Sequence, residues 1–114
     1  MGKRWVWGDG MESHWATVTK EGQWYVVTEN ATKFNIIFVN GSDWNGDANQ
    51  TVDMEGITEN TCFQLNQSGG GKVQYTIIDW DRVVRFDLLG LDRATRAYHY
   101  HRKVVLIKRN DLKF

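Results

Sequence analysis

Hydrophobic positions along the chain form short, often alternating runs that are rich in Val, Ile, Thr and aromatic residues. Glycine, asparagine and aspartate stand between these runs, and proline is absent, so turns depend on those three residue types. Runs that recur about every 8–12 residues with such turn signals are typical of an all-β sandwich or barrel. We expect strands at Arg4–Trp7, Trp15–Thr19, Gln23–Thr28, Lys33–Val39, Thr51–Met54, Cys62–Asn66, Lys72–Asp79, Val83–Leu88 and Lys103–Lys108.

Two segments depart from simple alternation. Lys33–Val39 is the most apolar run, which predicts a central strand buried on both faces. Leu91–His101 lacks glycine and allows a helical phase, so we expect one short helix or a loop there.

No apolar run reaches the length of a membrane-spanning helix or of a signal peptide, so we expect no membrane insertion.

The net charge of zero conceals opposite charges in two parts of the chain. Residues 1–81 hold five basic and eleven acidic residues, a net charge of −6, and all six tryptophans. Residues 82–114 hold nine basic and three acidic residues, a net charge of +6. A length of 114 residues suits one domain. We therefore expect a sandwich module at 1–81 and a basic segment at 82–114 that packs on it or completes it.

The tryptophans are the strongest candidates for a binding site. Trp5 and Trp7 share one face of a predicted strand about 7 Å apart, and Trp15 closes the polar loop that follows. Such rings stack on sugars or nucleobases, or pack in a core, and the residues alone leave these alternatives open. Trp44 lies in a polar loop, either as an exposed anchor or folded back on the sandwich, and we favour the second. Trp80 ends a strand and is interpreted as structural.

An alternating series of oxygen-bearing side chains between Asp43 and Asp53 raises the alternative of a calcium site. Ala48 and Met54 occupy the positions where an EF-hand loop has its glycine and its bidentate glutamate, so the helix-flanked calcium loop is excluded. Loops of this composition are mostly hydrogen-bonded turns, which is the reading we favour.

Catalytic and metal-binding patterns are weak. His99 and His101 would share a face of an extended segment, but partly exposed polar histidines are the simpler interpretation. Cys62 is the only cysteine, which excludes an internal disulfide and a multi-cysteine zinc site. Nucleotide-binding loops and nucleophile elbows are absent from the sequence, so we expect neither an enzyme nor a cofactor or metal.

The basic segment has two interpretations. Its cations and the pair Tyr98 and Tyr100 resemble a nucleic-acid-binding surface in composition. The equal and opposite charge of the two parts favours packing against the acidic part instead. Nucleic-acid binding therefore stays an alternative function, as does a structural or assembly domain without a small ligand.

Four segments together resemble carbohydrate-binding module family 26, the starch-binding modules of bacterial amylases, above all those of gut Bacteroidetes. They are Phe34–Gly41, Asn49–Met54, Gly56–Phe63 and Tyr75–Asp79. Trp5–Gly8, Trp15 and Gly22–Val27 fall where that family has its aromatic strand, its platform tryptophan and a further strand. The resemblance covers residues 5–81.

The resemblance implies an immunoglobulin-like β-sandwich that binds α-glucans without cleaving them. It also implies an extracellular or bacterial cell-surface location and an amylase catalytic domain in the parent protein. The family's ligand-binding positions correspond to Trp5, Trp7, Trp15 and Gln50 in this sequence.

The chain departs from the family in three places. It lacks the strand that precedes the aromatic strand, it has Trp80 where a second cysteine is common, and nothing after Asp81 matches. A missing strand leaves a sheet edge vacant. We expect Val83–Leu88 or Lys103–Lys108 to fill this edge, either in the same molecule or by strand exchange in a homodimer.

Overall fold

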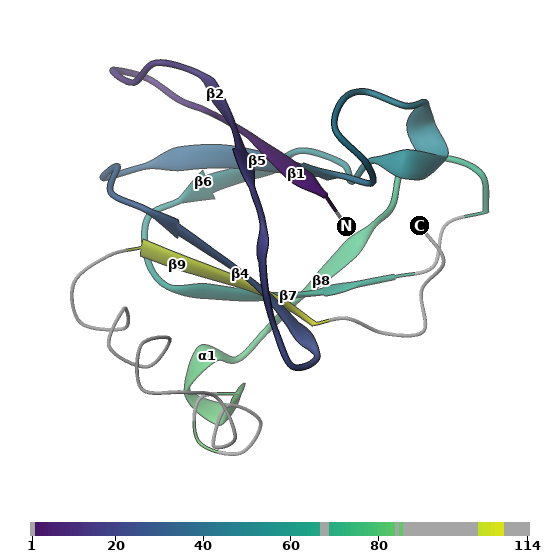
Figure 1. Ribbon diagram of the computed structural model, residues 1–114. Coiled ribbons are helices and arrows are strands. Elements are labelled where there is room, and N and C mark those ends of the chain that lie inside the picture. The colour runs from purple at the N-terminus through teal and green to yellow at the C-terminus, as the bar shows by residue number, and fades with distance from the viewer. Residues whose placement is uncertain (1, 67–68, 84, 86–102, 109–114) are drawn as a thin grey trace.

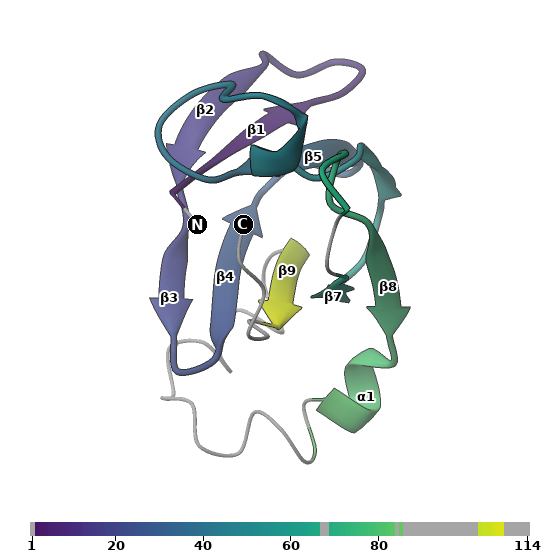
Figure 2. The ribbon, with the colours of Figure 1, turned by 90° about the vertical axis from the view of Figure 1, so that its right-hand side faces the viewer.

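Two β-sheets face each other in the computed structural model, which describes residues 2–66, 69–83, 85 and 103–108 (Figures 1 and 2). The first sheet has the order β2-β1-β5-β6, with bounds Lys3–Trp7 (β1), His14–Thr17 (β2), Phe34–Val39 (β5) and Met54–Ile57 (β6). The second has the order β3-β4-β9-β7-β8, with bounds Thr19–Glu21 (β3), Trp24–Glu29 (β4), Thr61–Leu65 (β7), Tyr75–Ile78 (β8) and Lys103–Lys108 (β9). The predicted all-β sandwich is confirmed.

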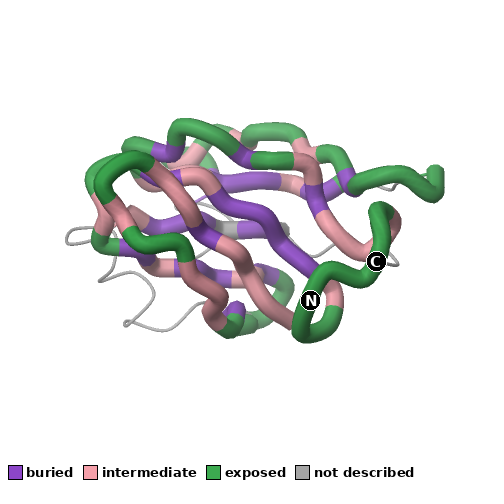
Figure 3. The backbone as a smooth tube through the Cα atoms, turned by 90° about the horizontal axis from the view of Figure 1, so that it is seen from above, coloured by how far each residue is buried: buried purple, intermediate pink, exposed green. Residues whose placement is uncertain are grey.

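The core lies between the sheets because alternate residues of each strand point inward. It is built from Val6, Val27, Phe34, Ile36, Phe38, Met54, Phe63, Leu65, Val105 and Ile107, among others. Figure 3 shows the buried positions along the middle of the molecule. Ile37 and Val39 alternate with these inward residues and are also buried, so β5 is covered on both faces, as its sequence predicts.

The predicted strand at Thr51–Met54 lies elsewhere, since β6 begins at Met54 and runs to Ile57. Thr51 is fully buried, and its hydroxyl accepts a hydrogen bond from the Phe38 backbone N–H at 3.0 Å. It also forms an isolated bridge with Val73. Thr51 therefore links β5 to the segment around Val73, three residues before β6 begins at Met54.

A short helix replaces the described part of the strand expected at Val83–Leu88. Helix α1 spans Trp80–Arg82, and Val83 and Arg85 continue in helical conformation. The Asp79 side chain accepts a hydrogen bond from the Asp81 backbone N–H at 3.1 Å, which caps the helix start. Residues 84 and 86–88 lie outside the described residues, as does the segment Leu91–His101.

The outer face of the second sheet carries a smaller apolar cluster. Val83 packs there with Trp24, Val26, Cys62 and Val104, and Trp80 and Ile78 contact the same cluster. Helix α1 therefore covers this face, and Trp80 has a structural role there.

Within the part of the chain that the structure describes, no helix has the length and apolar character needed to cross a membrane.

Strand β9 occupies the centre of the second sheet (Figure 2). It pairs antiparallel with β4 and parallel with β7, and the Val104 N–H donates to the Asn60 side chain at 2.9 Å. Both partners belong to the same molecule. The expectation that Lys103–Lys108 fills a sheet edge is therefore wrong in its location, because β9 joins the hairpins β3-β4 and β7-β8 into one sheet.

Two isoleucines aligned with Phe63 provide a matched test of this topology. Ile107 on β9 and Ile77 on β8 both lie opposite Phe63, but Ile107 is fully buried while Ile77 is 65% exposed. Ile107→Ala should lower the free energy of unfolding by about 2–5 kcal/mol, whereas Ile77→Ala should stay within about 0.5 kcal/mol of the parent. Urea unfolding measures both, and equal costs would contradict a central β9.

Candidate functional site

The aromatic cluster starts from the alternation of β1. Val6 is fully buried between the sheets, so its neighbours Trp5 and Trp7 project from the outer face of the first sheet. Antiparallel pairing places Trp15 of β2 directly opposite Trp5, and residues in such a pair share a face. Their ring centroids lie 5.2 Å apart with an interplanar angle of 55°. Trp5 and Trp15 are therefore in contact on this face.

Trp44 completes the cluster from the loop between β5 and β6. Its ring centroid lies 4.8 Å from that of Trp15 and 6.4 Å from that of Trp5, at interplanar angles of 56° and 69°. The ring folds back on the sheet, which is the alternative we favoured, yet the residue remains 44% exposed. Three rings so inclined cannot form one flat platform, and they present an angled apolar surface to solvent.

Side chains of the loop hold Trp44 in place through turn hydrogen bonds. The Asp43 carboxylate accepts from the Trp44 backbone N–H at 2.7 Å, and the Asn49 amide donates to the Asn45 carbonyl at 2.8 Å. The Asn40 N–H donates to the Asn49 carbonyl at 2.8 Å and closes the loop. These side chains act as turn formers, and among the described residues no three His, Cys, Asp or Glu side chains gather as a metal-binding group.

The other two residues implied by the family resemblance lie on the same sheet face. Trp7 is half-buried opposite Asn35 of β5, and within the described chain its ring contacts none of Trp5, Trp15 and Trp44. Gln50 forms a bridge opposite Val39, which itself lies opposite Lys3 of β1. Gln50 therefore sits on the outer face, beyond β5 from the tryptophan-bearing strands.

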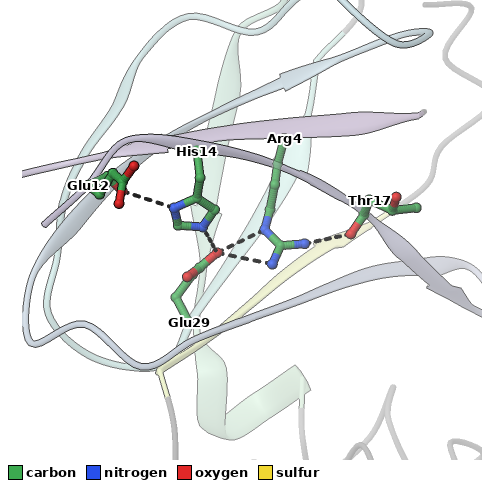
Figure 4. Close-up of polar contacts among 5 residues, drawn as sticks. All are labelled: Arg4, Glu12, His14, Thr17 and Glu29. Carbon is green, nitrogen blue, oxygen red and sulfur yellow. Dashed lines mark hydrogen bonds and ion pairs between the residues drawn. The ribbon is translucent and has the colours of Figure 1, made fainter.

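Behind the aromatic cluster, a charged group joins the two sheets (Figure 4). Arg4 Nη2 lies 3.0 Å and Nε 3.1 Å from Oε1 of Glu29 on β4, and Arg4 Nη1 donates to the Thr17 carbonyl at 2.6 Å. His14 Nε2 lies 3.2 Å from the same carboxylate oxygen. The side chains of Arg4 and Glu29 are only 12% and 10% exposed, so the ion pair is largely shielded from water.

His14 faces an acceptor at each ring nitrogen. Its Nδ1 lies 3.1 Å from the Glu12 carbonyl oxygen, and its Nε2 faces the Glu29 carboxylate. Carbonyl and carboxylate oxygens only accept, so both contacts are hydrogen bonds at the same time when both nitrogens carry a proton. The ring therefore links the start of β2 to β4.

A groove of about 610 Å³ lies at a different place, between the ends of β6 and β8 beside α1. Among the described residues, its lining includes four carboxylates, from Glu55, Glu59, Asp79 and Asp81, and no lysine or arginine. Carboxylates repel phosphate groups, so this part of the lining does not favour nucleic acid. The aromatic cluster lies outside this groove, and stacking on exposed rings requires no deep cavity.

Comparison of the chain with protein-family models, with curated proteins and with solved structures gave no match.

Two parts of this region were missed by reasoning from the sequence. The sequence predicts that Trp44 folds back on the sandwich but not that it contacts Trp5 and Trp15, because a glycine- and asparagine-rich loop signals a turn without showing which strands it covers. The ion pair between Arg4 and Glu29 joins residues from different sheets, and nothing in their sequence spacing indicates that they meet. A lone arginine and histidine on inward positions of β1 and β2 were the available signal.

The different environments of two tryptophans can be tested by stability. Trp24 is buried in the outer cluster of the second sheet, so Trp24→Ala should cost about 3–5 kcal/mol. Trp44→Ala should cost about 1 kcal/mol, because it removes only ring contacts at the surface. Chemical unfolding measures both values. A cost for Trp44→Ala as large as that for Trp24→Ala would mean that Trp44 is a core residue.

Proposed function

We propose that this protein binds carbohydrate without cleaving it, and that its ligand is an α-glucan such as starch or a maltooligosaccharide. One observation carries the proposal: Trp5, Trp15 and Trp44 gather on one outer face with centroid distances of 4.8–6.4 Å, and Trp44 is 44% exposed. Contiguous apolar patches on a protein surface mark interaction sites, whereas apolar residues scattered singly do not.

The geometry supports a sugar in particular. The C–H faces of glucose rings stack on indole, and an α-glucan curves, so successive glucose units meet rings inclined to one another. The rings here are inclined by 55–69°. Gln50 lies on the same sheet face and carries an amide that can both donate to and accept from hydroxyl groups. Its role in the site is part of the proposal.

The wider setting follows from the family resemblance alone. A non-catalytic module of this kind would hold an attached amylase on its substrate, outside the cell or at a bacterial cell surface. A shallow, solvated site should bind with a Kd of about 1 mM to 1 μM, which corresponds to roughly −4 to −8 kcal/mol.

Single substitutions of the clustered tryptophans should weaken binding of maltoheptaose. Loss of one stacking ring should cost about 1–3 kcal/mol, which is about 5- to 150-fold in Kd. Isothermal titration calorimetry on Trp5→Ala, Trp15→Ala and Trp44→Ala measures this, with Trp80→Phe as a control because Trp80 lies against the second sheet. Absence of binding to the parent protein would overturn the proposed function, and binding of DNA that falls steeply with salt would favour the nucleic-acid alternative.

Discrimination between glucans provides a second test. Cellohexaose is a straight ribbon of β-linked glucose, and inclined rings cannot all stack on one flat face. We expect it to bind at least about tenfold more weakly than maltoheptaose, a difference of about 1.4 kcal/mol. Competition in affinity electrophoresis on starch measures the ratio, and equal affinity would show that ring inclination does not select the ligand.

A further inference from the structure

The residues that precede Trp5 and Trp15 in the chain both contact one carboxylate oxygen, Oε1 of Glu29. Arg4 immediately precedes Trp5, and His14 immediately precedes Trp15. Successive residues of a strand point to opposite faces, so Arg4 and His14 point inward where the two indoles point outward. Both inward side chains reach Oε1 of Glu29, at 3.0 Å and 3.2 Å (Figure 4).

The strand that carries Trp15 needs this attachment. Strand β2 has four residues, and among the described strands it lies at the edge of its sheet and pairs only with β1. Its burial is incomplete along its whole length, so apolar packing holds it weakly. The contacts of His14 with Glu29 and of Arg4 with the Thr17 carbonyl tie both ends of β2 to the interior.

We propose that Glu29 is a positioning residue for the aromatic site: through Arg4 and His14 it fixes the separation and tilt of Trp5 and Trp15. This inference rests on the proposed function for its effect on glucan affinity, although its effect on ring geometry is independent of any ligand. Binding sites require their contact groups to be held by partners behind them, to within about 0.5 Å.

The charges around Glu29 favour this role. Arg4 of β1 and His14 of β2 face its carboxylate, Lys103 of β9 lies opposite it in register, and Glu12 presents only its backbone carbonyl to His14. Charge-assisted hydrogen bonds are shorter and more directional than neutral ones, and partial burial of Arg4 and Glu29 strengthens theirs. A neutral glutamine at position 29 keeps the size of the side chain and loses the charge.

The experiment reads the ring geometry directly, by the exciton couplet that two contacting indoles produce in circular dichroism. All variants carry Trp44→Ala, which removes the Trp5–Trp44 and Trp15–Trp44 contacts. Of the tryptophan ring contacts among the described residues, the one between Trp5 and Trp15 then remains. Loss of the couplet in Trp15→Phe assigns the signal. We expect Glu29→Gln to reduce its amplitude by about half or more under conditions where the protein stays folded.

A control variant on the same strand distinguishes positioning of the indole rings by Glu29 from a general contribution of Glu29 to stability. Val27 lies two residues before Glu29 on the same inward face of β4, and Val27→Ala lowers stability without touching the charged group. It should leave the couplet unchanged. His14→Ala should reduce the couplet and His14→Gln should restore it, since the glutamine amide can still donate to Glu29. An undiminished couplet in Glu29→Gln, or an equal loss in Val27→Ala, would overturn the proposal.

Glucan affinity distinguishes this inference from the function on which it rests. In the protein that retains Trp44, Glu29→Gln should weaken maltoheptaose binding about tenfold, and Val27→Ala should not. If the parent protein binds no glucan, the proposed function fails, while the couplet still decides the role of Glu29. If the parent binds and Glu29→Gln binds equally well, the positioning role fails alone.

Discussion

The register of β1 is the constraint on which both the core and the candidate site depend. Alternation along this strand sends Arg4 and Val6 between the sheets and Trp5 to the outer face. A slip of one residue would exchange the two faces, exposing Val6 and forcing an indole into the space that Arg4 occupies. Pairing with β5 and the bond from Arg4 to Glu29 both oppose such a slip.

Much of this arrangement was accessible from the sequence because it is local. Alternation and turn residues predict β1, β4 and β5 closely, and the i, i+2 spacing puts Trp5 and Trp7 on one face. Features that depend on distant partners were not accessible. These include the contact of Trp44 with Trp15, the start of β6 at Met54 after the buried Thr51, and the meeting of the two sheets at Glu29.

The opposite charges of the two parts of the chain take on a different meaning in the structure. The basic part supplies β9, whose described residues pair with β4 and β7 from the acidic part. Lys103 lies opposite Glu29, so at least one of the added cations meets the acidic part in register. The change of composition near residue 81 therefore does not coincide with a boundary of the second sheet.

The central position of β9 has a consequence for how the protein reaches its native state. The described strand farthest along the chain lies between two hairpins that precede it in the sequence, and its parallel pairing with β7 requires a long loop closure. Such topologies fold slowly, and the absence of proline removes prolyl isomerisation as a competing slow step. A slow refolding phase would thus report the rate at which β9 inserts. Until β9 has inserted, β4 and β7 expose unpaired strand edges to other chains.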